Sequence, residues 1–492
     1  MTQDLGGYFD EESYPAQLTY KMTPGWLWAL ALRHGWRAPD PSGAFRMLDI
    51  GCGDGVALAA IAASHPESTV EGIDGMAEHI VRGRAFARGI TNLELAHALF
   101  GEALKDGGLP CDFVTAHGVL AWVAPEIRAE ALDLAAARLA PGGICAVSYN
   151  ALPGWSDRLA YQHIIRQFAA TGEGSGTERY FAAHERTREL AEAGLTTVPM
   201  NVVEFFDDVA TKAPPDYFPH EFLAGGWQPL WGADVRREMA ARGLVYLGQA
   251  EFERARADLA LRPGPREVVE KAGSPDLRDT LFDLALNAPF RIDLYGRAPR
   301  RAEDDTFGQV WFRARKDADA ALAGRTTAGS IRFDNPAARA LLEALQGGPQ
   351  MLATLAEDLR LGLPDVLNAA DCLVLGRIAE PCAPLAGDMA AVAFNARLSR
   401  AALTPDGTAI DVLATPFGPV KAKPMEIALL AHTPKELLAA AQQQPVVATR
   451  FLQDGVAPND PSVEPELTIA KDEVRRRLAR VGVPVVPESP SL

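Results

Sequence analysis

Short apolar runs alternate with amphipathic stretches over the first 150 residues of the chain. Five apolar runs have the length and flanking turn residues of buried strands: residues 45–50, 69–74, 93–96, 113–116 and 144–149. Three stretches between them carry apolar residues at helical spacing: residues 56–64, 77–88 and 127–139. Strands that alternate with helices of about 10–15 residues form parallel crossover units. The pattern therefore predicts an α/β fold with a doubly wound sheet and helices on both of its faces.

Beyond residue 150 the pattern becomes mainly helical. Four stretches have helical periodicity: residues 156–171, 184–193, 201–210 and 233–242. Apolar strands return at residues 244–250 and 290–295, and two strands this far downstream do not begin a new sheet on their own. We expect them to complete the first sheet as its last two strands, which makes residues 151–240 a helical insertion.

The rest of the chain is expected to form two smaller units. Residues 330–385 carry three short helical stretches and an extended end, the outline of a winged helix, and residues 386–492 form a small α+β region. The tail after residue 483 is rich in proline and serine and is expected to be disordered. The predicted boundaries are residues 1–150 for the sheet core, 151–300 for the helical insertion with the last two strands, 301–329 for a linker, 330–385 for the winged-helix-like domain and 386–492 for the C-terminal region with its tail.

Charge and cysteine content narrow the classes of partner and location. A chain of 492 residues suffices for about three domains, and 64 acidic against 48 basic residues give a formal charge of −16. Negative charge repels phosphate backbones and anionic lipids, so nucleic acid is not expected as a partner. No apolar run approaches the ~18 residues needed to span a bilayer, so membrane insertion is not expected either. Five cysteines without a CxxC pair, and nine first residues without a secretory signal, predict a cytoplasmic protein without a metal site.

The clearest chemical signal follows the first predicted strand, where residues 48–55 read LDIGCGDG. Glycines at 51, 53 and 55 let the backbone turn tightly and let a ligand approach where no Cβ intervenes. A dinucleotide-binding fingerprint requires its third glycine three positions after the second, and Val56 stands there. The spacing therefore favours a nucleoside ligand other than a nicotinamide dinucleotide.

Two carboxylates add to this glycine turn. Asp74 ends the second predicted strand, nineteen residues after Gly55, where a carboxylate can accept both hydroxyls of an adenosine ribose. Asp49 directly precedes the turn and would face a cationic amino group. S-adenosylmethionine has a ribose diol, an α-amino group and a sulfonium but no phosphate, so it is the cofactor that these residues predict. A glycine turn with incidental acidic neighbours is the alternative interpretation.

These residues resemble the first motif and the acidic second-strand end of the class I S-adenosylmethionine-dependent methyltransferases, whose sheet has seven strands. Three further segments narrow the resemblance: HGVLAWV at 117–123, SYNALPGW at 148–155 and HEFL at 220–223. They are similar to bacterial methyltransferases with a methyltransferase regulatory domain, and the similarity covers about residues 8–300. Several members of that family, including the rickettsial outer-membrane-protein enzymes, are protein-lysine methyltransferases.

Methyl transfer requires an aligned and unprotonated acceptor. A free lysine has a pKa of ~10.4 and is charged at neutral pH, so an aromatic pocket that desolvates the amine, or a nearby base, must supply the neutral form. The residues expected to act in catalysis are His117, Trp122, Tyr149 and Asn150. The residues expected to contact the cofactor are Asp49, Gly51, Cys52, Gly53, Gly55, Asp74, His117, Tyr14 and Tyr20.

Several of these residues have a structural alternative. His117 could simply cap the turn after the fourth strand, and Trp122 and Trp155 are equally compatible with core packing. Tyr14 and Tyr20 could close over the cofactor without touching the acceptor. The Asn/Asp-Pro-Pro-aromatic motif of other amino-directed methyltransferases does not occur after the fourth strand, so that position does not reveal the acceptor.

The sequence thus predicts a methyltransferase that acts on lysine side chains of a protein. A small-molecule methyltransferase and a non-catalytic cofactor-binding scaffold are the alternatives, and the presence of both Asp49 and Asp74 argues against the scaffold. Residues 330–385 hold seven acidic but only four basic residues, which disfavours DNA binding by the winged-helix-like domain. That domain is expected to dock a protein acceptor or a second copy of the chain.

Overall fold

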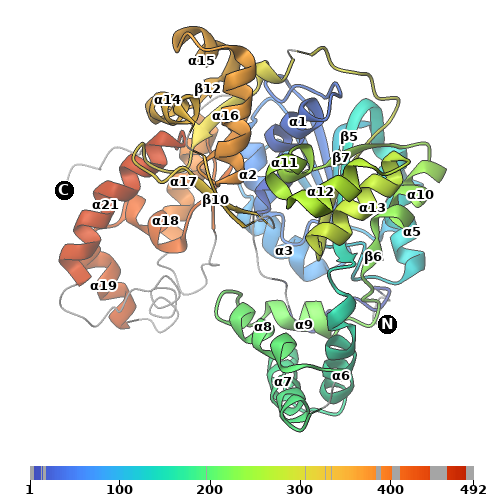
Figure 1. The fold of residues 1–492 in the computed structure, drawn as a ribbon. Coiled ribbons are helices and arrows are strands. Elements are labelled where there is room, and N and C mark those ends of the chain that lie inside the picture. Colours follow the sequence, from blue (N-terminus) through green and yellow to red (C-terminus); the bar gives the residue numbers. More distant parts are fainter. Residues whose placement is uncertain are drawn as a thin grey trace.

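The structure is a computed structural model that describes residues 5–12, 14, 18–194, 197–304, 306–326, 329–333, 335–383, 389–401, 411–443 and 463–483. A central sheet has the strand order β3-β2-β1-β4-β5-β8-β7 (Figure 1). Its strands are β1 (Arg46–Ile50), β2 (Thr69–Asp74), β3 (Leu93–His97), β4 (Cys111–Ala116), β5 (Leu139–Leu152), β7 (Val245–Gln249) and β8 (Phe290–Gly296). This is the seven-stranded class I methyltransferase sheet predicted from the sequence.

The strand directions show how the two downstream strands join the sheet. Strands β1 to β5 pair in parallel, whereas β8 runs antiparallel to both β5 and β7. The two downstream strands therefore complete the first sheet, as their isolation in the sequence indicated. A two-residue strand, β6 (Leu230–Trp231), pairs with the end of β5 and extends it beyond the main sheet.

Helices cover both faces of this sheet, and the period of two along the strands explains why. On β4, Phe113 packs into a buried cluster with the first helix, whereas its neighbour Val114 packs into a second cluster on the opposite face. The flanking helices are α1 (Pro24–Arg33), α2 (Val56–Ser64), α3 (Ala77–Phe86), α4 (Phe100–Asp106) and α5 (Pro125–Arg138).

The helical insertion forms a lobe that projects from the body of the molecule (Figure 1, bottom). Its helices are α6 (Leu159–Ala169), α7 (Gly176–Glu192), α8 (Met200–Ala210) and α9 (Tyr217–Phe222). Stacked rings hold the lobe together, with Tyr161 and Phe206 at 4.5 Å and Tyr180 and Phe218 at 4.7 Å between centroids. The helices that follow are α10 (Gly232–Ala241) before β7, and α11 (Ala257–Ala260), α12 (Pro263–Glu270) and α13 (Pro275–Leu286) between β7 and β8.

The segment predicted as a linker is in fact part of a folded unit. Strand β9 (Trp311–Ala314) lies in the middle of a three-stranded antiparallel sheet, between β12 (Gln350–Met351) and β13 (Ala379–Cys382). The prediction of a linker over residues 301–329 is therefore wrong, because β9 supplies buried side chains such as Phe312. The same unit contains the hairpin β10 (Ala323–Thr326) and β11 (Gly329–Arg332), with helices α14 (Pro336–Ala344), α15 (Leu352–Asp358) and α16 (Leu363–Leu375).

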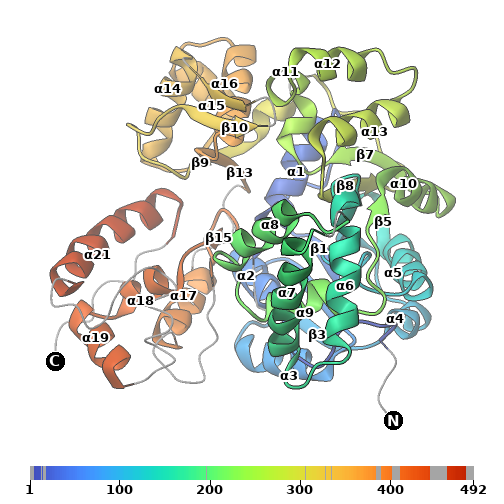
Figure 2. The same cartoon turned by 60° about the horizontal axis from the view of Figure 1, so that its bottom comes forward.

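The last unit packs against the helix that follows the glycine turn. Ala391 and Phe394 of its first helix share a buried cluster with Val56 and Ala59 of α2. Figure 2 shows this unit beside the sheet body, with α21 at its outer side. Its elements are α17 (Met389–Ala401), β14 (Val412–Leu413), β15 (Val420–Lys421), α18 (Pro424–Ala431), α19 (Pro434–Gln443) and α21 (Val463–Arg480). The tail predicted to be disordered lies outside the described residues.

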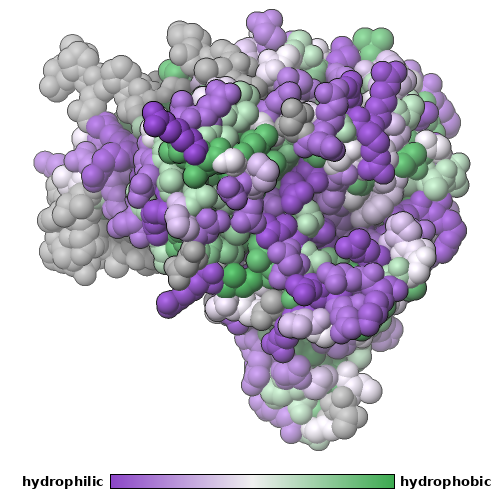
Figure 3. Space-filling model, turned by 45° about the horizontal axis from the view of Figure 1, so that its top comes forward, coloured by the Kyte–Doolittle hydropathy of each residue, from purple (hydrophilic) through white to green (hydrophobic). Residues whose placement is uncertain are grey.

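Hydrophilic residues cover most of the face drawn in Figure 3, where apolar areas interrupt them. Within the described ranges, no helix is both long enough and apolar enough to cross a lipid bilayer. The apolar side chains of these helices are instead buried in the clusters described above.

Candidate active site

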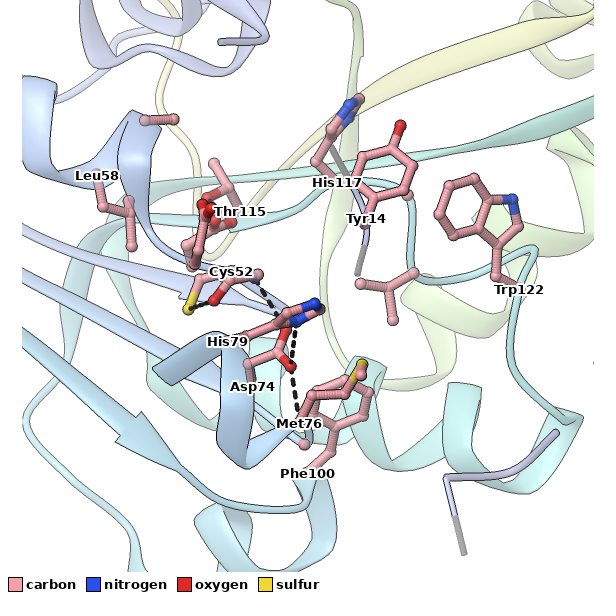
Figure 4. A pocket seen from close by; sticks show the side chains of 18 of the residues that line it. Tyr14, Cys52, Leu58, Asp74, Met76, His79, Phe100, Thr115, His117 and Trp122 are labelled. Carbon is pink, nitrogen blue, oxygen red and sulfur yellow. Dashed lines mark hydrogen bonds and ion pairs between the residues drawn. The ribbon is translucent and has the colours of Figure 1, made fainter. Parts of the chain in front are cut away.

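A cavity opens at the carboxyl ends of β1, β2 and β4, where the strand order reverses on either side of β1. Open α/β sheets bind their ligands at this kind of switch point. Asp49, Asp74 and Thr115 reach the cavity from the ends of the three strands. Figure 4 shows Asp74 with His79 at one end of it, and Tyr14, His117 and Trp122 at the other. Asp74, Tyr14, His117 and Trp122 were all among the residues predicted from the sequence, whereas His79 was not.

The glycine turn between β1 and α2 leaves open space beside one of its residues, Gly53. Gly51, Gly53 and Gly55 all have positive φ, at 74°, 57° and 67°. A Cβ on Gly51 would lie 2.6 Å from Val119, and one on Gly55 would lie 2.8 Å from Leu95, so packing requires glycine at both positions. A Cβ on Gly53 would meet nothing within 4 Å. Gly51, Cys52 and Gly53 line the cavity, whereas Gly55 does not line it and is the N-cap residue of α2.

Asp74 is held in place by the protein itself. Its Oδ2 accepts a hydrogen bond from the Gly53 amide and its Oδ1 accepts one from the Met76 amide, both at 2.8 Å. His79 Nδ1 lies 3.2 Å from Oδ1. A carboxylate has about four acceptor positions, so the two backbone amides leave acceptor positions on Asp74 for the ribose. The sequence analysis missed His79, which lies on α3 five residues after Asp74.

Asp49 is poised between its charged and neutral forms. Thr115 donates a hydrogen bond from Oγ1 to Asp49 Oδ1 at 2.6 Å. Removal from water raises the pKa of Asp49 to about 7, and the charge of Asp74 adds to this, although the Thr115 hydrogen bond opposes it. A cationic group in the cavity would favour the carboxylate form. The α-amino group of S-adenosylmethionine is such a cation, so this residue fits the expected cofactor.

The described residues that line the cavity combine carboxyl groups with aromatic rings. Four of them are acidic, and Lys and Arg do not occur among them. Such a lining attracts cations and disfavours phosphates and carboxylates. The acidic residues are Asp49, Asp54, Asp74 and Glu130, and the aromatic rings are those of Tyr8, Tyr14, Phe100 and Trp122.

His117 lines the cavity, and both of its ring nitrogens are engaged. Nε2 lies 2.8 Å from the Thr19 hydroxyl, and Nδ1 lies 2.8 Å from the Ser148 hydroxyl. Burial, with a smaller effect from the charge of Lys421, lowers the pKa of His117 to about 4. The imidazole is therefore neutral at physiological pH and a weak base. Its contacts tie the N-terminal segment to β5, which favours a positioning role over direct proton transfer.

Of the aromatic residues predicted to lie in the site, two line the cavity and one does not. Tyr14 and Trp122 both line the cavity, with ring centroids 5.2 Å apart in an edge-to-face arrangement. Tyr20 does not line the cavity, because its ring packs edge-on against Trp26 at 5.0 Å. Its expected contact with the cofactor therefore has no support in the structure.

Tyr149 and Asn150 lie on β5 outside the cavity. The Tyr149 hydroxyl donates to Asp293 Oδ2 at 2.6 Å, and Asn150 donates from Nδ2 to Glu221 Oε1. Both were expected to act in catalysis, but β5 continues past them to Leu152, where it pairs with β6, and neither lines the cavity. Trp155 packs against Trp227, with 4.9 Å between centroids, so it belongs to the core.

Comparison with known proteins agrees with this geometry. Residues 22–199 match the model of a family described as a methyltransferase domain, and residues 214–297 match a predicted methyltransferase regulatory domain. The protein is a class I S-adenosylmethionine-dependent methyltransferase with this regulatory domain. The regulatory match begins just before α9 and ends just after β8, so the methyltransferase takes the last two strands of its sheet from it.

One relative and one solved structure are similar to most of the chain, and a second relative is similar to a shorter part of it. An uncharacterized protein of Synechocystis is 21% identical over 360 residues, which are 72% of this chain and 71% of that protein. An uncharacterized protein of Rickettsia prowazekii is 33% identical over 161 residues, which are 32% of this chain and 62% of that protein. The structure of PKMT2 from Rickettsia typhi in complex with AdoHcy is similar in fold, with a TM-score of 0.68 at 18% identity, and the match covers 96% of this chain and 100% of that one.

Proposed function

We propose that this methyltransferase modifies the Nζ amino group of lysine side chains in a protein acceptor. The observation that carries the proposal is the aromatic wall of the cavity, where the rings of Tyr8 and Tyr14 lie against Trp122 and the described lining residues include no lysine or arginine. A protonated lysine is attracted to the faces of such rings. An acceptor with a carboxylate or a phosphate at its reactive end would be repelled.

The aromatic walls also favour the reactive form of the acceptor. S-adenosylmethionine, when bound, supplies an electrophilic methyl group, and the acceptor nitrogen must present a free electron pair to it. Tyr8, Tyr14 and Trp122 exclude water from their side of the cavity, and desolvation lowers the pKa of an amine. His117 is neutral at physiological pH and adds no positive charge that would repel the lysine.

The parts of the chain outside the sheet support an acceptor of protein size. The lobe of α6–α9 and the C-terminal unit flank the sheet body and offer surfaces that a small-molecule enzyme does not need (Figure 2). The likeness of fold to PKMT2 also extends over these parts. The resemblance of residues 8–300 to bacterial protein-lysine methyltransferases points in the same direction.

The proposal is tested by incubating the purified protein with radiolabelled S-adenosylmethionine and a bacterial lysate that has been separated into proteins and small molecules. We expect label in the protein fraction and, after complete hydrolysis, in methylated lysine. Asp74→Ala serves as the control, because loss of cofactor binding should remove the label. Label that enters only the small-molecule fraction would contradict the lysine acceptor and support a metabolite acceptor instead.

A further inference from the structure

Helix α9 of the regulatory domain places a buried glutamate behind the aromatic wall of the cavity. Glu221 is 3% exposed. Its Oε1 accepts hydrogen bonds from Asn150 Nδ2 and, at 3.0 Å, from Trp227 Nε1, while its Oε2 accepts one from the Tyr217 hydroxyl at 3.3 Å. Asn150 and Trp227 belong to β5 and to the turn after α9, so the carboxyl joins the regulatory domain to the sheet.

This carboxyl group has neutral donors and no cationic partner in the part of the chain that the structure describes, where no ion pair involves Glu221. Burial raises the pKa of Glu221 to about 7, whereas hydrogen bonds from Trp227, Tyr217 and Asn150 lower it. A buried carboxylate is normally paired with a cation, because a buried and unpaired charge is costly. Glu221 can therefore gain a favourable interaction from a cation that enters from outside the protein.

The aromatic wall connects this carboxyl group to the cavity. Trp122 lines the cavity, and its ring stacks on that of His220, the neighbour of Glu221 on α9, with 6.3 Å between centroids. Tyr14 packs edge-on against Trp122 at 5.2 Å and lies 6.4 Å from the ring of Tyr217, which contacts the same carboxyl group. Figure 4 shows Tyr14 and Trp122 side by side at the end of the cavity away from Asp74. One layer of rings thus separates Glu221 from the space that the acceptor would enter.

We propose that Glu221 is a positioning residue for the acceptor lysine, because it holds Tyr217 beside the aromatic wall and supplies negative charge behind that wall. The inference rests on the proposed lysine acceptor and names the residue that makes the cavity selective for a cationic side chain. It also gives the regulatory domain a part in the reaction, since α9 brings the carboxyl group to the wall. A purely structural role, in which Glu221 only holds α9 on β5, is the alternative.

Several titratable groups face Glu221, so the test must cancel their effects. Burial and the negative charge of Glu221 raise the pKa of Tyr217 well above 10, and Tyr180 is raised in the same direction, so both stay neutral in the working range of pH. The ratio of wild-type to variant activity at each pH removes contributions that the two proteins share, including those of Asp49 and of the lysine itself. The titratable groups around Glu221 are Tyr217 and the chain neighbour His220 from α9, Tyr180 from α7, and Tyr14, whose ring lies edge-on to that of His220 at 5.3 Å.

The experiment compares kcat/KM for a lysine-containing peptide in wild type and Glu221→Gln at saturating S-adenosylmethionine. The carboxylate forms as the pH rises through about 7. We therefore expect the ratio of wild type to variant to grow from about twofold at pH 6 to about tenfold at pH 8, mainly through KM, with the cofactor Kd unchanged. In Tyr217→Phe, which keeps the ring but loses one donor, the midpoint of the wild-type rise should move to higher pH.

Glu380→Gln is the matched control, because Glu380 is also buried, at 7% exposure, but pairs with Arg313 and Arg315 and does not line the cavity. Its ratio should stay constant with pH. A ratio for Glu221→Gln that is equally constant would overturn the inference while leaving the lysine acceptor intact. If Glu221→Gln does not fold, an unmoved midpoint in Tyr217→Phe would overturn it. A wild type that binds cofactor but labels no lysine would overturn the proposed function and this inference with it.

Discussion

The ionisation of Asp49 should make the Kd of the cofactor depend on pH, and the size of the effect follows from the pKa of this carboxyl group. In the cofactor-free protein its carboxyl has a pKa of about 7, mainly because it is removed from water. If the bound cofactor requires the carboxylate, the observed Kd is the limiting Kd multiplied by one plus the ratio of protonated to ionised Asp49. Binding should then be about 10 times weaker at pH 6 than at pH 8, and about 100 times weaker at pH 5.

Asp49→Asn separates this effect from other titrations. The amide cannot ionise, so its affinity should be flat with pH and should lie about 1.5–3 kcal/mol below that of wild type at pH 8, where a charged hydrogen-bond partner has been lost. Thr115→Val removes the hydroxyl that lowers the pKa of Asp49, so the midpoint of its binding curve should move to higher pH.

Isothermal titration calorimetry with S-adenosylhomocysteine between pH 5 and 8.5 measures all three proteins without turnover. This ligand keeps the α-amino group that would face Asp49. A wild-type Kd that does not change between pH 5 and 8 would refute the reasoning, because the raised pKa of Asp49 would then have no connection with the ligand. A slope that persists in Asp49→Asn would assign the titration to another group.

Three further perturbations test the cavity and the fold. Asp74→Ala should weaken cofactor binding by about 1.5–3 kcal/mol in the same calorimetric assay, because it removes a charged acceptor. Gly53→Ala should weaken cofactor binding, because its Cβ would enter the cavity. Gly142→Ala is the control, because Gly142 has the same open surroundings and a φ of 82° but lies outside the cavity. It should leave cofactor binding unchanged, and both variants should lower Tm by a similar amount. Arg291→Met should lower the free energy of unfolding in urea by about 3–5 kcal/mol, because the fully buried Arg291 pairs with Asp279, Asp283 and Asp293; an unchanged midpoint would contradict this.

The sheet could be predicted because its strands carry their own signals. The five parallel strands are short apolar runs between helices, and the last two had no other sheet to join. Strand β9, the middle strand of the smaller sheet, was missed because the charged Arg313 is of a residue type that usually lies at the surface. Arg313 is in fact 4% exposed and pairs with Glu380 on the neighbouring strand β13. A sequence alone does not show that two charges 67 residues apart neutralise each other.

Buried ion pairs also explain why the count of charged residues over 330–385 does not give the charge of the surface there. Two of the seven acidic residues are internal ion-pair partners. Glu380 pairs with Arg313, and Asp371, which is 1% exposed, pairs with Arg33 and Arg256 from other parts of the chain. The excess of acidic residues therefore does not describe the surface of that unit, and docking by it stays a prediction.

The cofactor side of the cavity was predictable from local spacing, but the contacts behind its aromatic wall were not. Asp49, Gly53 and Asp74 lie within one strand–turn–helix–strand unit, so their spacing fixes where they meet. Glu221 meets Asn150 across 71 residues, and nothing local in the sequence indicates that contact. Asn150 was placed in the cavity because a strand end usually faces the cleft, whereas pairing with β6 carries β5 past that edge.

The most direct test of the account is to locate the transferred methyl group by mass spectrometry. The purified methyltransferase is incubated with methyl-deuterated S-adenosylmethionine and lysate proteins, and tryptic peptides are sequenced for deuterated methyl groups. The account predicts the label on lysine Nζ atoms, with its amount sharply reduced in Gly53→Ala at limiting cofactor but not in Gly142→Ala. Label on carboxyl or hydroxyl groups of proteins, with unmodified lysine, would contradict the claim that this acidic and aromatic cavity serves a lysine acceptor.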